Sequence, residues 1–111
     1  MTRKEKKSFY ITTTIPYVNA DPHIGFALEL VQADVIARYQ RLLGKDVFFS
    51  TGTDEHGQKV WEASQKEGKD VQDYVDKYAQ NYINLKKILN LSNDNFIRTT
   101  DIQHIDATEE F

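Results

Sequence analysis

The stretch FYITTTIPYVNADPHIGF, residues 9–26, decides the fold. Its first part, residues 9–15, contains only aromatic and β-branched residues, which predicts a buried strand. Pro16 has no backbone N–H to give to a ladder and is expected to end that strand. Turn-forming residues follow as far as Pro22, and a helical pattern begins at His23. The stretch therefore predicts a strand, a loop and the start of a helix.

An amphipathic helix is predicted over residues 23–43, because its apolar residues recur at spacings of three and four. The residues of this stripe are Ile24, Ala27, Leu28, Val31, Val35, Tyr39 and Leu42. Gly44 is the kind of residue that ends a helix. The segment 46–51 is again rich in strand-forming residues, so a second strand is expected there.

The remaining elements continue the alternation of strands and helices. A polar loop over residues 52–57 precedes a short helix at 58–66, and Asp70 is expected to cap a long helix. The apolar stripe of that long helix is interpreted as core: Val71, Tyr74, Val75, Tyr78, Tyr82, Leu85, Ile88 and Leu89. A third strand is predicted at 96–99, and a last helix, capped by Asp101, near Gln103.

This order, β-α-β-α-α-β-α, predicts an α/β fold with a short parallel sheet flanked by helices. A doubly wound domain normally has two such halves, and this chain supplies one. The basic residues 1–8 are expected to form a flexible segment, and residues 9–111 to form the domain.

Composition narrows the class of protein. The chain has 111 residues, 40% of them hydrophobic and 28% charged, with no cysteine and no apolar run of the roughly 20 residues that cross a bilayer. A disordered tail, a membrane protein, disulfides and thiolate zinc sites are therefore excluded, and a cytoplasmic location is expected. Seventeen acidic residues against fourteen basic ones do not favour independent tight binding of RNA.

The loop before residue 23 has the chemistry of a phosphate site. In an open parallel sheet, ligands bind beyond the carboxyl ends of the strands, where a following helix presents free N–H groups. Gly25 would allow close approach of a nucleotide, and His23 can donate a hydrogen bond to a phosphate oxygen. A single glycine does not make a dinucleotide loop, so a redox cofactor is disfavoured.

Each candidate also has a purely structural explanation. His23 alone would more often cap a helix, and Asp54 could cap the helix at 58–66. Tyr17 could be a packed ring. A tryptophan such as Trp61 is more often a core residue, or an anchor for a partner, than a ring that stacks on a cofactor.

Several ordered motifs resemble one family. PHIGF (22–26) is similar to the HIGH signature of class I aminoacyl-tRNA synthetases, and PYVN (16–19) has the form seen in that class. TDEHG (53–57) resembles the motif of the methionyl-tRNA synthetases, and QADVIARY (32–39) resembles their first helix. The resemblance runs from about Phe9 to Ile105, nearly the whole chain.

This resemblance implies the amino-terminal half of a Rossmann-like catalytic domain. The family activates methionine with ATP and Mg²⁺ and passes the methionyl group to tRNA(Met). Carried over position by position, it implies ATP binding by Asn19, His23, Gly25 and Phe26, with His23 catalytic, and methionine binding by Ile15, Tyr17 and Asp54. No metal ligand and no zinc site is implied in this chain.

Two departures from the family pattern are visible. Phe26 stands where the signature has its second His, and losing a donor aimed at transition-state charge typically costs about 3–4 kcal/mol. The family's lysine-containing KMSKS loop has no counterpart here, nor do the second half of the domain, the zinc-binding connective insertion or the anticodon-binding domain. A fragment is therefore expected, and slow or absent activity when it is isolated.

Alternatives remain open at this stage. One is a non-catalytic module, derived from a class I synthetase, that binds a nucleotide or a partner. Another is a fragment of an isoleucyl or leucyl enzyme, which shares the first motif. The sheet edge left by the absent half could pair with that half or with another copy of the chain.

Overall fold

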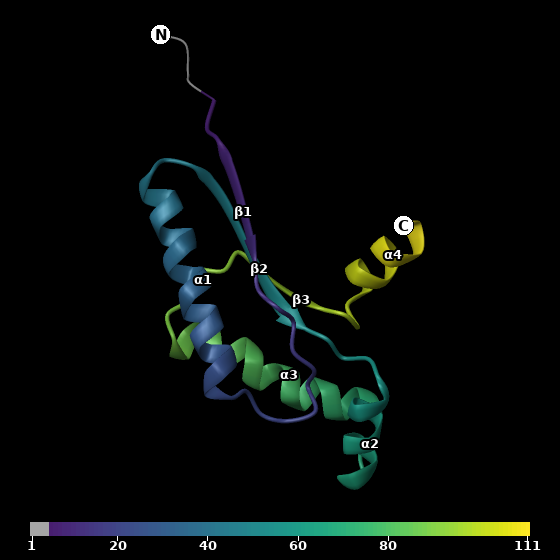
Figure 1. Cartoon of the computed structure of the whole chain (residues 1–111). Helices are drawn as coiled ribbons and strands as arrows, with labels where there is room; N and C mark the ends of the chain where they lie inside the picture. Colours follow the sequence, from purple (N-terminus) through teal and green to yellow (C-terminus); the bar gives the residue numbers. More distant parts are fainter. Residues whose placement is uncertain (1–4) are drawn as a thin grey trace.

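The computed structural model describes residues 5–111 and has the predicted order of elements (Figure 1). The prediction of a flexible segment over residues 1–8 falls partly on residues 1–4, which lie outside the described residues. The elements are β1 (Ser8–Thr12), α1 (Ile24–Leu42), β2 (Asp46–Thr53), α2 (Gln58–Lys66), α3 (Val71–Ile88), β3 (Asn95–Arg98) and α4 (Ile102–Glu110).

The three strands form a parallel sheet in the order β1-β2-β3, as an alternating α/β chain requires. Phe9 pairs with Val47 in β2, and Thr51 of β2 pairs with Phe96 in β3. The central strand β2 extends to Thr53, further than predicted, whereas β1 ends at Thr12. Within the described residues, β1 is an edge strand with one side unpaired.

One face of the sheet carries the core. Phe49 of β2 packs with Ala33 and Ala37 of α1, and a second cluster joins the first turns of α1 to α3. The stripe predicted on α3 is largely buried, with Tyr74, Val75 and Tyr82 inside the core, as helical spacing indicated.

The stripe predicted on α1 is not the buried one. The buried residues of α1 are Phe26, Leu30, Ala33, Asp34 and Ala37. Most of the predicted stripe faces outward, with Ile24 87% and Leu28 58% exposed. Helix α1 is apolar on two faces. The spacing of three and four residues pointed to the face that the described residues leave exposed, and not to the buried one.

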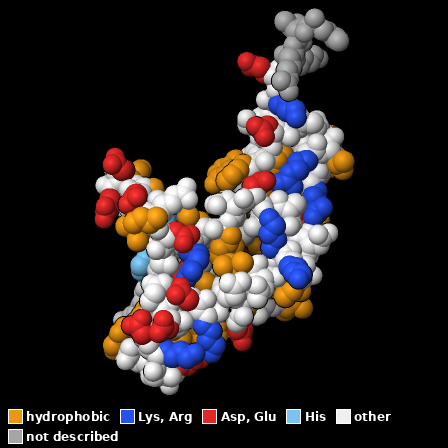
Figure 2. All heavy atoms as spheres, turned by 180° about the vertical axis from the view of Figure 1, so that it is seen from behind, with side chains coloured by type: hydrophobic (Ala, Val, Ile, Leu, Met, Phe, Trp, Pro, Cys, Tyr) orange, Lys and Arg blue, Asp and Glu red, His pale blue; other side chains and the backbone are white. Residues whose placement is uncertain are grey.

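The opposite face of the sheet is also uncovered. Tyr10 and Phe48 stack there with ring centroids 5.7 Å apart, and both remain substantially exposed. Figure 2 shows exposed hydrophobic side chains beside the hollow that separates the α4 arm from the rest of the molecule. No residue of α4 is buried. The described chain is therefore a two-layer half of an α/β sandwich.

None of the helices within residues 5–111 is both long and apolar enough to cross a membrane.

Candidate functional site

The loop that leaves β1 is fixed to both neighbouring elements. The Thr13 and Thr51 hydroxyls are 2.6 Å apart, which ties the loop to β2. The backbone N–H and the hydroxyl of Thr14 donate to the carboxylate of Glu29 on α1, at 2.8 and 2.7 Å. The path of the loop beyond the carboxyl end of β1 is therefore set by α1 and β2 together.

Tyr17, in the loop after β1, and Asp54, the residue after β2, lie side by side. They form an isolated parallel bridge, and the Asp54 N–H donates to the Pro16 carbonyl at 2.9 Å. Val18, fully buried, anchors the loop immediately after the bridge. Tyr17 is half exposed, so it is not the packed ring of the structural explanation.

Asp54 does not cap α2. The N-cap of that helix is Gly57, which has a φ of 115° and no side-chain hydrogen bond. One carboxylate oxygen of Asp54 instead accepts a long hydrogen bond of 3.3 Å from the N–H of His56. Most of the hydrogen-bonding capacity of the Asp54 carboxylate is therefore free for a cationic ligand.

His23 does cap α1, which confirms the structural explanation for this residue. Its Nδ1 accepts the N–H of Gly25 at 2.9 Å. An Nδ1 that accepts carries no proton, so in the neutral ring the proton lies on Nε2. The ring is exposed, and its Nε2–H is available as a donor at the helix start.

Gly25 is needed for this arrangement. A Cβ added there would lie 2.7 Å from Cε1 of His23, so the imidazole would have to turn away. The glycine therefore makes room for the ring of its own cap, besides leaving the backbone open to a ligand.

Phe26 points in the other direction. It is buried, and its ring meets that of Tyr82 edge to face with centroids 5.8 Å apart. The predicted contact of Phe26 with ATP is therefore restricted to its backbone, because its side chain belongs to the core.

The other predicted residues spread along the rim of the loop. Ile15 is exposed, as is Asn19. Asn19 lines an open depression of about 710 Å³ between the loop, α2 and α3. Tyr17 lines a second depression, of about 490 Å³, next to the start of α2. In residues 5–111, no hydrogen bond or ion pair joins His23 to the Tyr17–Asp54 bridge.

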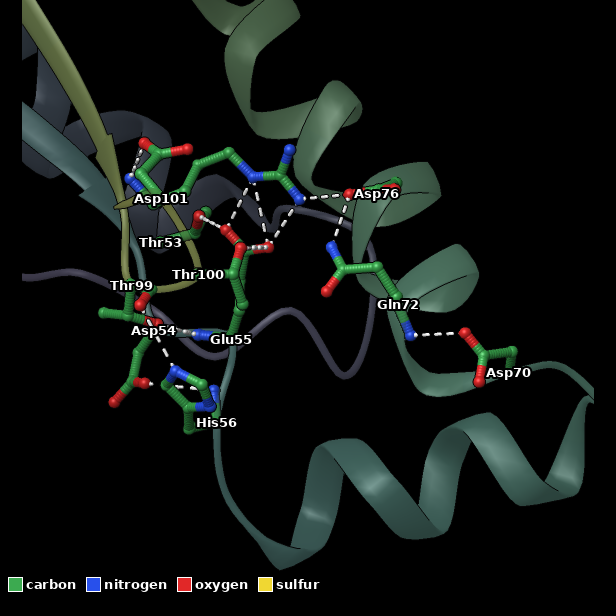
Figure 3. Close-up of polar contacts among 11 residues, drawn as sticks. Thr53, Asp54, Glu55, His56, Asp70, Gln72, Asp76, Thr99, Thr100 and Asp101 are labelled. Carbon is green, nitrogen blue, oxygen red and sulfur yellow. Dashed lines mark hydrogen bonds and ion pairs between the residues drawn. The ribbon is translucent and has the colours of Figure 1, made fainter. Parts of the chain in front are cut away.

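Sequence reasoning missed the buried ionic cluster beside Asp54, which is drawn in Figure 3. The carboxylate of Glu55 is fully buried and pairs with Arg98, which also contacts Asp76 of α3. Hydrogen bonds to Glu55 are the main cause that raises the pKa of Arg98, and the bond from Arg98 lowers the pKa of Asp76. The signal was present, since Glu55 is the middle residue of TDEHG, but its partners are distant in sequence.

No group of three or more His, Cys, Asp or Glu side chains in the described part of the chain is arranged to hold a metal ion.

The parallel sheet, with a loop and a capped helix at the carboxyl ends of its strands, defines the amino-terminal half of a Rossmann-like fold. The family model described as tRNA synthetases class I (M) matches residues 9–111. The chain belongs to this family.

Similar proteins carry the same amino-acid specificity, methionine, in their names. A methionine–tRNA ligase of Thermotoga maritima is 56% identical over 93% of this chain and 16% of its own length. One of Rhizobium meliloti is 48% identical over 96% of this chain and 20% of its own. The chain thus spans about a fifth or less of these two relatives.

A solved structure gives the same result. Mycobacterium tuberculosis methionyl-tRNA synthetase in complex with methionyl-adenylate aligns with a TM-score of 0.92 and 44% identity, covering 94% of this chain and 20% of that one. The Rossmann-like fold expected from the sequence is confirmed by this likeness.

Proposed function

We propose that the chain is the amino-terminal part of the catalytic domain of a methionine–tRNA ligase. The complete enzyme activates methionine with ATP and transfers the methionyl group to tRNA(Met). The observation that carries the proposal is the Tyr17–Asp54 bridge at the carboxyl ends of β1 and β2, in a chain of this family. The alignment with a methionyl-adenylate complex supports it.

Asp54 is the proposed partner of the methionine ammonium. A carboxylate makes strong charge-assisted hydrogen bonds to an ammonium, and that of Asp54 has free acceptor sites. Tyr17 and Ile15 supply an aromatic ring and an apolar wall, which suit a polarisable thioether.

His23 is the proposed hydrogen-bond donor to the phosphates of ATP. Its Nε2–H would reach a phosphate oxygen of ATP while Nδ1 holds the helix cap. The backbone N–H groups of Gly25 and Phe26 lie in the first turn of α1, where the helix dipole favours an anion, and Asn19 would bind from the loop.

The reaction needs no nucleophile from the protein. The methionine carboxylate attacks the α-phosphorus, the bond to the bridging oxygen breaks, and pyrophosphate leaves with its electron pair. His23 would stabilise the charge that builds on the phosphates. Mg²⁺ would be carried by the phosphates, since no acidic cluster of the described residues is built to hold it.

The uncovered surfaces around β1 are the proposed contact with the rest of the catalytic domain. The unpaired edge of β1 adjoins two apolar surfaces, the outer face of α1 and the Tyr10–Phe48 stack. Further hydrogen-bond donors to the phosphates, and the contacts with tRNA, would come from parts of the ligase other than this chain. The complete ligase is expected to charge tRNA(Met) in the cytoplasm.

Methionine-dependent ATP–pyrophosphate exchange tests the proposal. A complete ligase that carries this chain at its amino terminus should exchange, and Asp54→Asn should raise the KM for methionine by about tenfold or more. The isolated chain should exchange very slowly. A rate near that of the complete ligase would contradict the proposed incompleteness, and an unchanged methionine KM in Asp54→Asn would contradict the role of Asp54.

A non-catalytic nucleotide-binding module is the second candidate, favoured by the burial of Phe26 where the signature has a donor. This module would bind ATP but would not support exchange even in the complete polypeptide. The same assay therefore separates the two functions.

A further inference from the structure

Glu55 is a charged residue with no exposed side-chain surface, and every acceptor direction of its carboxylate is occupied. Arg98 donates from Nε to Oε2 at 2.8 Å and from Nη2 to Oε1 at 2.6 Å. The hydroxyl of Thr53 donates to Oε2 at 2.9 Å, and that of Thr100 to Oε1 at 3.1 Å. The carboxylate is thereby fixed in position and in rotation.

The cluster connects three elements, as Figure 3 shows. Arg98 ends β3, and its Nη2 also donates to Oδ1 of Asp76 on α3 at 2.6 Å. Gln72, one turn earlier, donates to the same Asp76 oxygen at 2.9 Å. The tip of β2 is therefore linked to α3 through side chains, in addition to its backbone pairing with β3.

The backbone around Asp54 is held on both sides. The N–H of Glu55 donates to the hydroxyl of Thr99 at 2.8 Å, and the N–H of Thr99 donates to the carbonyl of Thr53 at 3.2 Å. His56 donates from Nε2 to the Thr99 carbonyl at 3.2 Å. The side chains of Glu55 and His56 are thus tied to the β3 end, whereas the Asp54 carboxylate between them is not.

Stability alone does not explain such a cluster. A buried ion pair often contributes no more than an apolar pair of the same volume, because both charges lose their hydration. A paired charge does, however, specify one geometry, since any shift of the backbone leaves a buried carboxylate unsatisfied. The cluster therefore acts chiefly on geometry at the strand tip.

We propose that Glu55 and Arg98 are positioning residues that fix the direction of the Asp54 carboxylate toward the amino-acid ammonium. The inference rests on the proposed function of Asp54. Neither Glu55 nor Arg98 touches the ligand, and both act through the backbone on either side of Asp54. The consequence is selective: a defect in the cluster impairs the amino-acid end of the site and leaves the ATP end, on α1, unaffected.

The test is steady-state pyrophosphate exchange by the complete ligase, with methionine and ATP varied separately. Glu55→Gln keeps the volume of the side chain but removes the charge that Arg98 chelates. It should raise the KM for methionine by roughly 10- to 100-fold and change the KM for ATP by less than about twofold. Asp73→Asn, the same chemical change on the exposed first turn of α3, is the matched control and should change neither.

Each outcome decides between the inference and a simple structural role. A lower melting temperature with an unchanged methionine KM, measured well below melting, would overturn the inference. If Glu55→Gln does not fold, Arg98→Lys takes its place: it keeps the charge but cannot chelate the carboxylate, so an unchanged methionine KM overturns the inference equally.

Asp54→Asn separates this inference from the function on which it rests. A raised methionine KM in Asp54→Asn with a normal one in Glu55→Gln leaves the proposed function standing and removes the positioning role. A normal methionine KM in Asp54→Asn removes the proposed function, and the inference with it.

Discussion

Tyr17, in the loop after β1, and Asp54, directly after β2, are joined in a parallel bridge by the hydrogen bond from Asp54 N–H to the Pro16 carbonyl. The ring of Tyr17 lies near Gly57, where an added Cβ would be 3.5 Å from it. An exposed ring and a carboxylate with free acceptor sites are thereby held next to each other by a hydrogen bond between their backbones.

The first prediction concerns the ring of Tyr17. Tyr17→Ala removes an aromatic wall and should raise the methionine KM by about tenfold in the complete ligase, because the thioether loses an apolar contact. Tyr17→Phe keeps the ring and the bridge, so its KM should stay within about twofold of the parent value. An equal rise in KM in the two variants would show that the hydroxyl, and not the ring, matters, and no rise in either would contradict a contact of Tyr17 with methionine.

Two variants separate the helix cap that His23 forms from its proposed hydrogen bond to a phosphate. His23→Ala loses both the helix cap and the proposed hydrogen-bond donor to phosphate. The free energy of unfolding should therefore fall by about 1 kcal/mol, and ATP should bind more weakly. His23→Ser restores a good N-cap that is too short to reach a phosphate. Urea unfolding of the 111-residue chain and calorimetric titration with ATP give the two readouts. ATP affinity that is unchanged in both variants would contradict a phosphate site at the start of α1.

Gly52 is required for space and Gly44 for backbone conformation. A Cβ at Gly52 would lie 2.0 Å from the carbonyl oxygen of Ile97, so Gly52→Ala must separate β2 from β3 and should cost about 3 kcal/mol or more. Gly44 has a φ of 81° but no atom near its missing Cβ, so Gly44→Ala should cost only about 1 kcal/mol. Denaturant unfolding of both variants tests the order, and a greater loss in Gly44→Ala would contradict the close strand pairing.

Asp34 should make the fold sensitive to acid. Burial alone would raise the pKa of Asp34, but hydrogen bonds from Ser92 and Arg38 outweigh it and the pKa lies below its ordinary value of 3.8. A carboxyl with a lowered pKa stabilises the folded state above the pKa of the unfolded chain, and this contribution is lost as the pH falls through the folded value. Asp34→Asn should therefore be less stable at about pH 7, and its stability should change less between about pH 4 and pH 2.

Urea midpoints at several pH values check this prediction. Asp76 also has a lowered pKa, because Arg98 donates to it, so Asp34→Asn should reduce the acid dependence without abolishing it. An acid dependence identical to that of the parent chain would contradict a pairing of Asp34 with Ser92 and Arg38.

The two faces of α1 should respond differently to charge. Leu28→Lys lies on the uncovered face and should reduce self-association of the isolated chain, measured by sedimentation, without lowering its free energy of unfolding. Leu30→Lys, on the buried face of the same helix, should prevent folding. If Leu28→Lys also unfolds the chain, the assignment of the buried face of α1 is wrong.

The order of elements, the parallel sheet and the bounds of α2 could be predicted from sequence because each depends on local patterns. The buried face of α1 could not, since Leu28 and Leu30 are equally apolar and only the position of the sheet distinguishes them. The same holds for the site. Asp54 could be singled out from the TDEHG motif alone. The proposed role of Glu55 could not, because it depends on Arg98, which the parallel pairing of β2 with β3 brings next to Glu55.

The anchoring of β2 at its tip has a consequence for the design of inhibitors. On the proposed role of Asp54, a compound that replaces the ammonium by a neutral group would face a carboxylate on a backbone that hydrogen bonds hold to the β3 end. On the proposed roles, a compound altered in its phosphates would instead meet His23, an exposed side chain held by the hydrogen bond from the Gly25 N–H. Chemical variation should therefore be tolerated far better at the nucleotide end than at the amino group.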